Sequence, residues 1–271
     1  MRRRVWFWLA TAIALAFFLF PIIWIFLTAI KPDADAMHIG MDKLVTFSPT
    51  LVNYQELFTW TPIVLEIRNT LIVAVSSTIL AMVVALPAGY SFARWNTGSG
   101  HLLFVTVSTR MFPGAVAAIP FFLTFKALGL LDTQLGLTLL IFYFNMSFAT
   151  FLLFGFFREI PEELEQAAMV DGYGRFETFR RIIFPLIAPG AAITAAFCLV
   201  FAWNEFLYSF LFTNLDARTT SVGLAAFWGA IEIKWGRMAA DMTICILPTL
   251  LAAWFMQRYI IRGLTFGAVK G

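Results

Sequence analysis

Long apolar runs are the feature that most limits what this chain can fold into. Six of them stand out, at roughly 5–30, 68–93, 102–125, 135–157, 187–213 and 240–261. Each is long enough to cross a bilayer core of about 30 Å as a helix of about 20 residues. A helix satisfies its own backbone hydrogen bonds, whereas barrel strands would alternate apolar and polar residues, which these runs do not. The sequence therefore predicts an all-α membrane protein with six transmembrane helices, in a single domain over residues 1–271.

The composition agrees with a membrane protein. Hydrophobic residues make up 61% of the chain and charged residues 13%, whereas a soluble domain is about half apolar and about a quarter charged. The net charge of +3 is modest and the basic residues are spread between loops, so nucleic acid is not an expected partner. The first apolar run exceeds the ~7–15-residue core of a signal peptide, which predicts a retained first helix.

The distribution of lysine and arginine predicts the orientation of the six spans. Eleven basic residues fall on the side of the termini and of the 158–186 segment, and seven fall on the other side. Because basic residues are enriched in cytoplasmic loops, both termini and the 158–186 segment are expected in the cytoplasm.

Prolines interrupt several of the predicted spans, at Pro87, Pro113, Pro120 and Pro248. Each proline removes one helix hydrogen bond and tends to kink the helix. The third span carries Met111-Phe112-Pro113-Gly114 and is expected to be the most broken. An ordinary membrane kink and a bend that lines a pathway or acts as a hinge are both open interpretations.

Small residues recur every four positions in the second span, at Ala81, Ala85 and Gly89. This spacing lets two helices approach closely, so a tight helix contact is expected there. Cys198 and Cys245 fall inside apolar runs. A disulfide framework needs more cysteines in loops, so both thiols are most simply core side chains.

The longest polar interruption on the predicted inner face is the segment 158–186. Pro161 suits a first helical position, the acids after it suit a first turn, and Asp171-Gly172 suits a helix stop. A helix is therefore expected at about 161–170. A second helix is expected from Gly174 to Phe184, ended by Pro185, with Phe176, Phe179 and Ile183 on one apolar stripe. The spacing leaves open whether the first helix docks on a partner or lies at the membrane interface.

This segment resembles the cytoplasmic motif of binding-protein-dependent ABC importer permeases: Glu-Ala-Ala, three residues, Gly, nine residues, Ile, one residue and Leu-Pro. The matching positions here are Gln166-Ala167-Ala168, Gly172, Ile182 and Phe184-Pro185. Gln166 replaces the Glu of the motif and Phe184 replaces its Leu, while Glu165 stands next to the first departure. Asp171 before the glycine fits the carbohydrate-uptake branch.

The resemblance extends over nearly the whole chain. Residues 263–271 are similar to the ending of the smaller permease subunit of maltose-type importers, and residues 201–205 are similar to a segment of that branch. The resemblance implies that the first loop helix is a coupling helix on a cytoplasmic ATPase, through Glu165, Gln166, Ala167, Ala168, Asp171, Gly172 and Pro185. It implies a further ATPase contact at the C-terminus, through Gly267, Val269 and Lys270.

The resemblance also implies the partners. They are a second permease subunit, two cytoplasmic ATPase subunits that bind ATP and Mg, and an extracytoplasmic solute-binding protein, in a bacterial inner membrane. The chain itself is expected to hold no cofactor. The solute is expected to be a sugar or a sugar derivative, and the sequence leaves its identity open.

Polar residues inside the spans are candidates for the solute pathway, because ionisable groups in a bilayer are costly and often functional. These candidates are Arg110, Asn204, Glu205 and Tyr208. Asn204 and Tyr208 are four residues apart and are expected on one helix face. In alternative interpretations Glu205 pairs with a basic residue of the partner subunit or extends toward the outer surface, and Arg110 forms a structural bridge with Glu205.

Motifs of catalysis are missing from the sequence. No Gly-rich loop ends in Gly-Lys-Ser/Thr, His38 and His101 stand alone without metal-ligand spacing, and no Gly-x-Ser-x-Gly occurs. The chain is therefore expected to be a non-catalytic subunit that holds no metal. The alternatives are an ion-gradient-driven secondary transporter, which usually shows repeats and midplane acids, and a membrane enzyme with the 158–186 segment as its active site.

Overall fold

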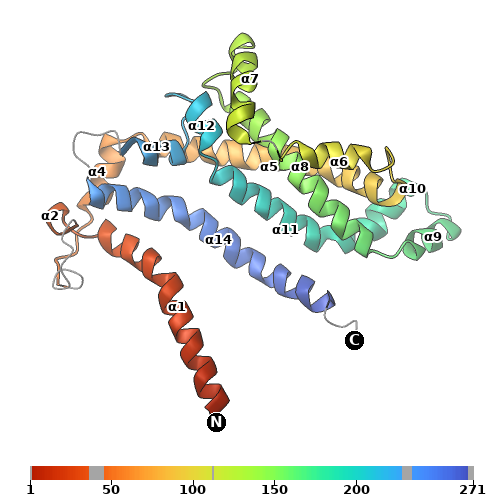
Figure 1. The fold of residues 1–271 in the computed structure, drawn as a ribbon, viewed down its shortest axis with the longest axis horizontal. Coiled ribbons are helices and arrows are strands. Elements are labelled where there is room, and N and C mark those ends of the chain that lie inside the picture. The colour runs from red at the N-terminus through yellow and green to blue at the C-terminus, as the bar shows by residue number, and fades with distance from the viewer. Residues whose placement is uncertain (1, 37–45, 112, 228–233, 268–271) are drawn as a thin grey trace. The chain divides into compact units, whose positions relative to one another are not determined.

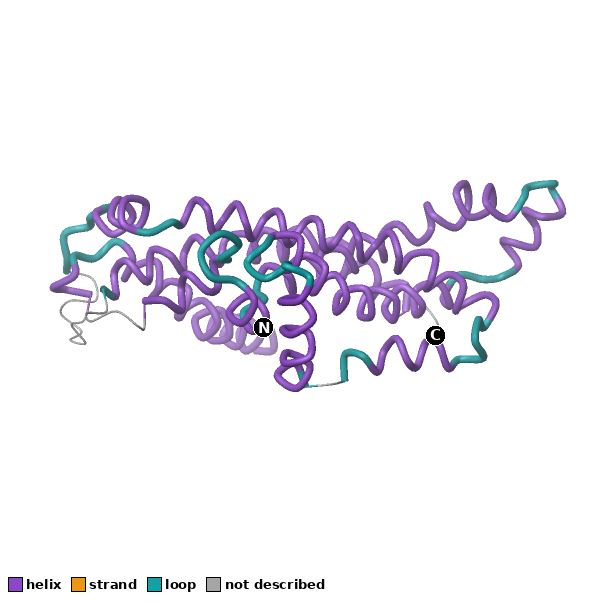
Figure 2. The backbone as a smooth tube through the Cα atoms, turned by 90° about the horizontal axis from the view of Figure 1, so that it is seen from above, coloured by secondary structure: helices purple, strands orange, loops and turns teal. Residues whose placement is uncertain are grey.

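The computed structural model describes residues 2–36, 46–111, 113–227 and 234–267, and every regular element in this part is helical (Figure 2). Five described helices are long and apolar enough to cross a membrane: Arg3–Ala29, Ile63–Trp95, Gln134–Glu159, Arg175–Trp203 and Trp235–Gln257. A shorter apolar helix covers Gly114–Ala127. The all-α membrane architecture is confirmed, while the count of six spans stays a prediction.

The chain divides into two compact units, which are described separately. The first comprises residues 1–66 and 220–248, and the second comprises residues 67–219 and 249–271. Two long helices contribute to both units, α5 (Ile63–Trp95) and α14 (Trp235–Gly267). The single permease domain predicted from the sequence stays a prediction.

The first unit is held together by polar contacts at the ends of its helices. It contains α1 (Arg2–Ala29), α2 (Asp33–Ala36), α4 (Val52–Trp60) and α13 (Thr220–Ala226), labelled in Figure 1. The amide of Asn53 donates to the carbonyl oxygens of Ala29 and Lys31, at 2.8 and 2.7 Å. Arg237 forms an ion pair with Glu56, and the hydrogen bond between them holds the pKa of the Glu56 carboxyl below its usual value.

The second unit is built around α5, α8 (Gln134–Glu159) and α11 (Phe184–Trp203), and α8 and α11 run side by side (Figure 1). One cluster of buried residues includes Ala85, Leu153, Phe157 and Ile187 from these three helices. Cys198 lies in the same cluster and is fully buried, as expected, whereas Cys245 is only partly buried. Each helix here buries one apolar face against the others, which stabilises the unit.

The small residues of α5 form the close contact that their spacing predicts. Ala81 and Ala85 are fully buried. A Cβ atom added at Gly89 would lie 3.1 Å from Cβ of Leu153 and 3.2 Å from the backbone N of Phe154. A glycine leaves room for the backbones of α5 and α8 to approach this closely, whereas a Cβ atom would require Leu153 and Phe154 to shift.

Larger side chains at Gly89 are expected to destabilise this unit. Gly89→Leu would overpack the contact and lower the free energy of unfolding by about 1–3 kcal/mol. Gly155→Leu is the matched control, because Gly155 is exposed on α8 and a Cβ there meets nothing within 4 Å. Thermal unfolding in detergent measures both variants. Equal behaviour of the two would contradict the close packing of α5 on α8.

The third apolar run is broken, as its proline and glycine predict. Helix α6 (His101–Ser108) ends before the break and α7 (Gly114–Ala127) begins after it, with Pro113 at the N-cap in an extended conformation (ψ 126°). Proline has no backbone N–H to continue a helix, which fits the division of this run into two helices with Pro113 at the start of the second. The other interrupting prolines, Pro87, Pro120 and Pro248, lie inside continuous helices.

The prediction that Pro185 ends the second loop helix is wrong. Helix α10 (Arg175–Thr178) runs into a π-helical turn, η1 (Phe179–Ile183), and then directly into α11. Pro185 sits in the first turn of α11. A proline has no backbone N–H to donate, and the wider π turn before it absorbs the missing bond. The segment 175–203 is therefore one continuous helix.

Candidate functional site

Helix α9 (Glu163–Val170) carries the Gln166-Ala167-Ala168 segment. It begins two residues later than expected, and Glu163 and Glu165 lie in its first turn. The helix ends in a glycine cap: Gly172 has φ +92°, its N–H donates to Met169 O, and the N–H of Tyr173 donates to Ala168 O at 3.0 Å. This pair of bonds is the Schellman motif, which favours glycine at this position. The helix stop predicted from Asp171-Gly172 is confirmed.

Glu165 anchors α9 to the end of α5. Its carboxylate accepts from Nε of Arg94 at 2.5 Å and from the hydroxyl of Tyr90 at 2.7 Å. The guanidinium of Arg94 also donates to Ile160 O at 2.8 Å. The side chains of Arg94 and Glu165 are 5% and 12% exposed. Because the pair is buried and hydrogen-bonded on both sides, it fixes α9 against the rest of the second unit.

The exposed side chains of α9 and its neighbour α10 include an apolar group beside the polar residues Glu163, Gln166, Arg175 and Glu177. Val170 is 87% exposed and Phe176 75% exposed, and Leu164, Ala167 and Met169 are exposed too. Gln166, which replaces the Glu of the family motif, is also exposed, while Ala168 is buried beneath the helix. An exposed apolar patch of this kind marks a surface that another protein or a membrane covers.

The predicted apolar stripe of the second loop helix is divided in the structure. Ile183 is fully buried and Phe179 packs on Tyr90 with ring centroids 5.0 Å apart, but Phe176 faces outward. The π turn at 179–183 winds more slowly than an α-helix, so positions before it fall out of phase with those after it. Sequence reasoning that assumes a constant 3.6-residue period therefore misplaces Phe176.

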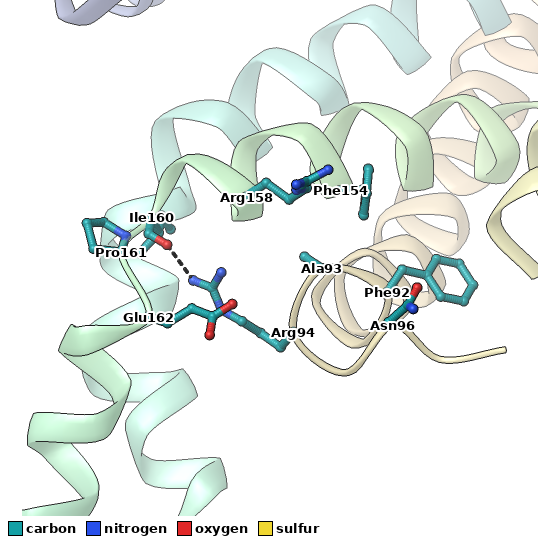
Figure 3. Close-up of a pocket in the computed structure, with 9 residues that line it drawn as sticks. All are labelled: Phe92, Ala93, Arg94, Asn96, Phe154, Arg158, Ile160, Pro161 and Glu162. Carbon is teal, nitrogen blue, oxygen red and sulfur yellow. Dashed lines mark hydrogen bonds between the residues drawn. The ribbon is translucent and has the colours of Figure 1, made fainter. Parts of the chain in front are cut away.

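A pocket of about 400 Å³ opens beside this anchor, between the ends of α5 and α8 (Figure 3). Its polar lining includes Arg94, Asn96, Arg158 and Glu162, and its apolar walls include Phe92 and Phe154. Figure 3 shows Arg158 on the side of Phe154, and Glu162 on the side of Arg94. The pocket lies at the positions where the apolar parts of both helices stop.

The four candidate residues of the solute pathway lie near two helix breaks. One is the break between α6 and α7, and the other follows the end of α11. Helix α11 ends at Trp203 and α12 (Leu207–Phe212) begins after a short turn. The expectation that Asn204 and Tyr208 share one helix face is therefore wrong. The carboxylate of Glu205 accepts from the N–H of Tyr208 at 2.9 Å, and the amide of Asn204 donates to Val200 O at 2.8 Å. These local bonds end one helix and start the next.

Tyr208 joins the second break to the first. It is buried, its ring stacks on Phe144 with centroids 4.8 Å apart, and its hydroxyl donates to Gly114 O at 3.2 Å. Arg110 is exposed, donates to Phe144 O at 3.1 Å and lies over the rings of Phe148 and Phe201. Asn204 is exposed, and its amide lies 3.3 Å from Oγ1 of Thr249. Aromatic faces beside polar groups suit a hydroxylated ring.

Asp132 organises a loop that sequence reasoning missed. Its carboxylate accepts from the backbone N–H groups of Asn214, Leu215, Asp216 and Ala217, at 2.9 to 3.2 Å. Burial alone would raise the pKa of this carboxyl, but the four donors outweigh it and hold the pKa below its usual value. Asn69 of α5 donates to Asp216 O and Arg218 O, so the same loop is also tied to α5.

Removing the charge of Asp132 is expected to loosen this loop. Asp132→Asn keeps the size of the side chain but weakens its hydrogen bonds, so stability falls by about 1–3 kcal/mol. Because the folded pKa lies below the unfolded one, the stabilisation is full above the unfolded pKa of about 3.9 and is lost as pH falls through the folded value. Asp216→Asn is the control, since it removes the same charge from an exposed side chain of the same loop. Limited proteolysis of the 213–219 segment measures both variants, and equal cleavage would contradict the role of Asp132.

The predicted C-terminal contact lies mostly beyond the described residues. Gly267 is the last residue of α14, and Val269 and Lys270 fall outside the part that the structure describes. Within the described residues, no group of three or more His, Cys, Asp or Glu side chains is placed to hold a metal ion.

Comparisons with known proteins identify the family. A family model described as the binding-protein-dependent transport system inner membrane component matches residues 79–265. The sulfoquinovosyl glycerol transport system permease protein SmoH of Agrobacterium fabrum is 33% identical, over 97% of this chain and 93% of its own length. The trehalose transport system permease protein SugB of Mycobacterium tuberculosis is also 33% identical, over 99% of each chain.

A solved structure shares the fold. One chain of a bacterial ABC transporter involved in the import of the acidic polysaccharide alginate superposes with a TM-score of 0.76, over 96% of this chain and 98% of that one. Its sequence identity is 22%, so this likeness concerns the fold alone. The family match and the two relatives together show that this chain belongs to the binding-protein-dependent transport system inner membrane components, the permease subunits of ABC transporters.

Proposed function

We propose that this chain is the permease subunit of an ATP-driven importer for a sugar or a sugar-derived solute, and that α9 couples it to a cytoplasmic ATPase. The observation that carries the proposal is α9 itself, a short helix capped by Gly172, anchored inward through Glu165 and exposed outward at Val170. The full-length relatives named for sulfoquinovosyl glycerol and trehalose transport support the sugar class.

Two rigid connections lead from α9 into the membrane. The buried pair of Glu165 and Arg94 joins α9 to α5, and the continuous helix 175–203 joins the loop to the fifth apolar run. When the ATPase subunits close on ATP, movement of α9 would pass through both connections and reorient the spans as rigid bodies. ATP and Mg are bound by the ATPase subunits, and this chain contributes no catalytic group.

The solute pathway is proposed along the two helix breaks. Asn204 and Arg110 are the exposed polar side chains there, while Glu205 and Tyr208 shape the turn that presents them. Asn204→Leu is expected to reduce uptake at least about ten-fold, because an unmatched solute hydroxyl costs about 1–3 kcal/mol. Asn214→Leu, in the loop held by Asp132, is the control. Equal uptake rates for wild type and Asn204→Leu would remove Asn204 from the pathway.

The remaining subunits are a second permease, a pair of ATPase subunits and an extracytoplasmic solute-binding protein, and the family description itself names dependence on a binding protein. Both termini and α9 would face the cytoplasm. Gly267, Val269 and Lys270 at the C-terminus would contact the same ATPase.

Co-purification tests this assignment. The chain would be extracted gently from its native host through a tag at the N-terminus, and the accompanying proteins identified by mass spectrometry. Recovery of a P-loop ATPase and a second permease is expected, and Glu165→Ala should lose the ATPase but retain the permease. Recovery of the chain alone, with solute transport in vesicles that lack ATP, would contradict the proposal in favour of a gradient-driven carrier.

A further inference from the structure

One of the two arginines that line the pocket between the ends of α5 and α8 has no ion-pair partner among the described residues. Arg94 is neutralised by Glu165 and also donates to Ile160 O. Arg158 lies over the ring of Phe154, with its guanidinium carbon 5.7 Å from the ring centroid, and forms no salt bridge with a described residue. Glu162 lines the pocket too, but Figure 3 shows it on the side of Arg94. The part of the pocket beside Arg158, away from Glu162, is therefore suited to an anion.

The position of the pocket matches the headgroup level of a bilayer. Arg158 directly follows the apolar stretch of α8, which ends in Phe156 and Phe157, and Arg94 lies in the last turn of α5. Charged residues at such positions lie where the hydrocarbon core ends. Phe92 and Phe154 give the pocket apolar walls on the membrane side of its two arginines. A ligand that is apolar at one end and anionic at the other fits both parts.

We propose that this pocket binds the phosphate headgroup of an anionic phospholipid. The phosphate would lie against the guanidinium of Arg158, and the glycerol and the start of the acyl chains would lie along Phe92 and Phe154. Basic pockets between transmembrane helices on the cytoplasmic side are suited to such headgroups, and a volume of about 400 Å³ is sufficient for one. That this leaflet is the cytoplasmic one rests on the proposed function.

A lipid in this pocket would act on coupling through Arg94. The same side chain lines the pocket and holds Glu165 of α9. A bound phosphate would restrain the ends of α5 and α8 next to that anchor, and so keep α9 in place. Anionic lipid is therefore expected to raise the share of ATP hydrolysis that is coupled to uptake.

Lipid binding can be measured on the full chain without its partners. The purified chain in detergent is titrated with phosphatidylglycerol or phosphatidylcholine and examined by native mass spectrometry. Phosphatidylglycerol is expected to bind more tightly, and Arg158→Gln should weaken its binding about five-fold, equivalent to the ~1 kcal/mol contributed by one basic residue at an anionic surface. Arg158→Lys should retain most of the binding because it keeps the charge.

Arg180→Gln is the matched control, since Arg180 is exposed on the neighbouring η1 turn and does not line the pocket. Equal loss from Arg180→Gln, unchanged binding by Arg158→Gln, or equal affinity for phosphatidylcholine would each overturn the proposal. Displacement of the lipid by millimolar inorganic phosphate would also overturn it, because the site would then be a general phosphate site. A chain that binds phosphatidylglycerol through Arg158 but recruits no ATPase would contradict the proposed function alone.

Discussion

Gly172→Val is expected to abolish most of the coupled transport. At φ +92° a valine is strongly disfavoured, and forcing a residue with a Cβ atom into such a conformation costs about 1–3 kcal/mol. The Schellman bonds of Gly172 and Tyr173 would break, so the end of α9 that presents Val170 would unwind. Uptake in vesicles should fall at least about ten-fold, which corresponds to ~1.4 kcal/mol.

Gly174→Ala is the control for that variant. Gly174 lies two residues further on, has an ordinary negative φ of −71° in extended backbone, and a Cβ there meets nothing within 4 Å. It should transport like wild type. If Gly172→Val transported as well as Gly174→Ala, α9 would not be the coupling helix.

Glu165→Ala is expected to detach α9 from the membrane helices. It leaves the guanidinium of Arg94 buried without its carboxylate, and breaking a buried pair in this way costs about 3–5 kcal/mol. The expected result is a large loss of thermal stability in detergent together with a loss of ATPase recruitment. Thermal unfolding and co-purification measure the two effects separately.

Glu163→Ala removes the same charge from the first turn of the same helix, but Glu163 is exposed. Its loss should cost only the ~0.3–1 kcal/mol of an interaction with the helix dipole. A further check is Glu165→Leu combined with Arg94→Leu, because an apolar pair of similar size can replace a buried ion pair at little cost. If Glu165→Ala behaved like Glu163→Ala, the buried pair would not hold α9.

Local patterns predicted the features that depend on neighbouring residues. The apolar runs predicted helices, the Asp171-Gly172 pair predicted the end of α9, and the spacing of Ala81, Ala85 and Gly89 predicted the close face of α5. Met111-Phe112-Pro113-Gly114 predicted the break between α6 and α7. In each case the physical cause lies within a few residues of the effect.

Contacts between residues far apart in the sequence could not be predicted from such local patterns. Arg94 and Glu165 are 71 residues apart in the chain, and Asp132 holds a loop more than 80 residues away. No local signal distinguishes these charges from solvated ones. The turn at 204–206 was missed for another reason, since it contains no proline or glycine and is formed by the side chains of Asn204 and Glu205.

Arg94 and Glu165 also change the interpretation of the motif. In the sequence, Glu165 stands next to Gln166, which replaces the Glu of the family motif. Glu165 points inward to Arg94 and Tyr90, whereas Gln166 is exposed. The outward face of α9 is therefore uncharged at the position of the family's Glu, and its exposed surface is mainly the apolar group around Val170.

Site-specific cross-linking tests the central claim, that α9 docks on the ATPase. A cysteine introduced by Val170→Cys would be labelled with a thiol-reactive photo-cross-linker, which on irradiation inserts into C–H bonds of any neighbouring chain, and Val83→Cys, which is 65% exposed in the middle of α5, would serve as the control. Natural Cys198 and Cys245 are buried or partly buried and would be replaced by alanine. The account predicts a cross-link from position 170 to the ATPase and none from position 83. A transporter that is active with ATP but forms no cross-link from position 170, at any bridge length, would contradict it.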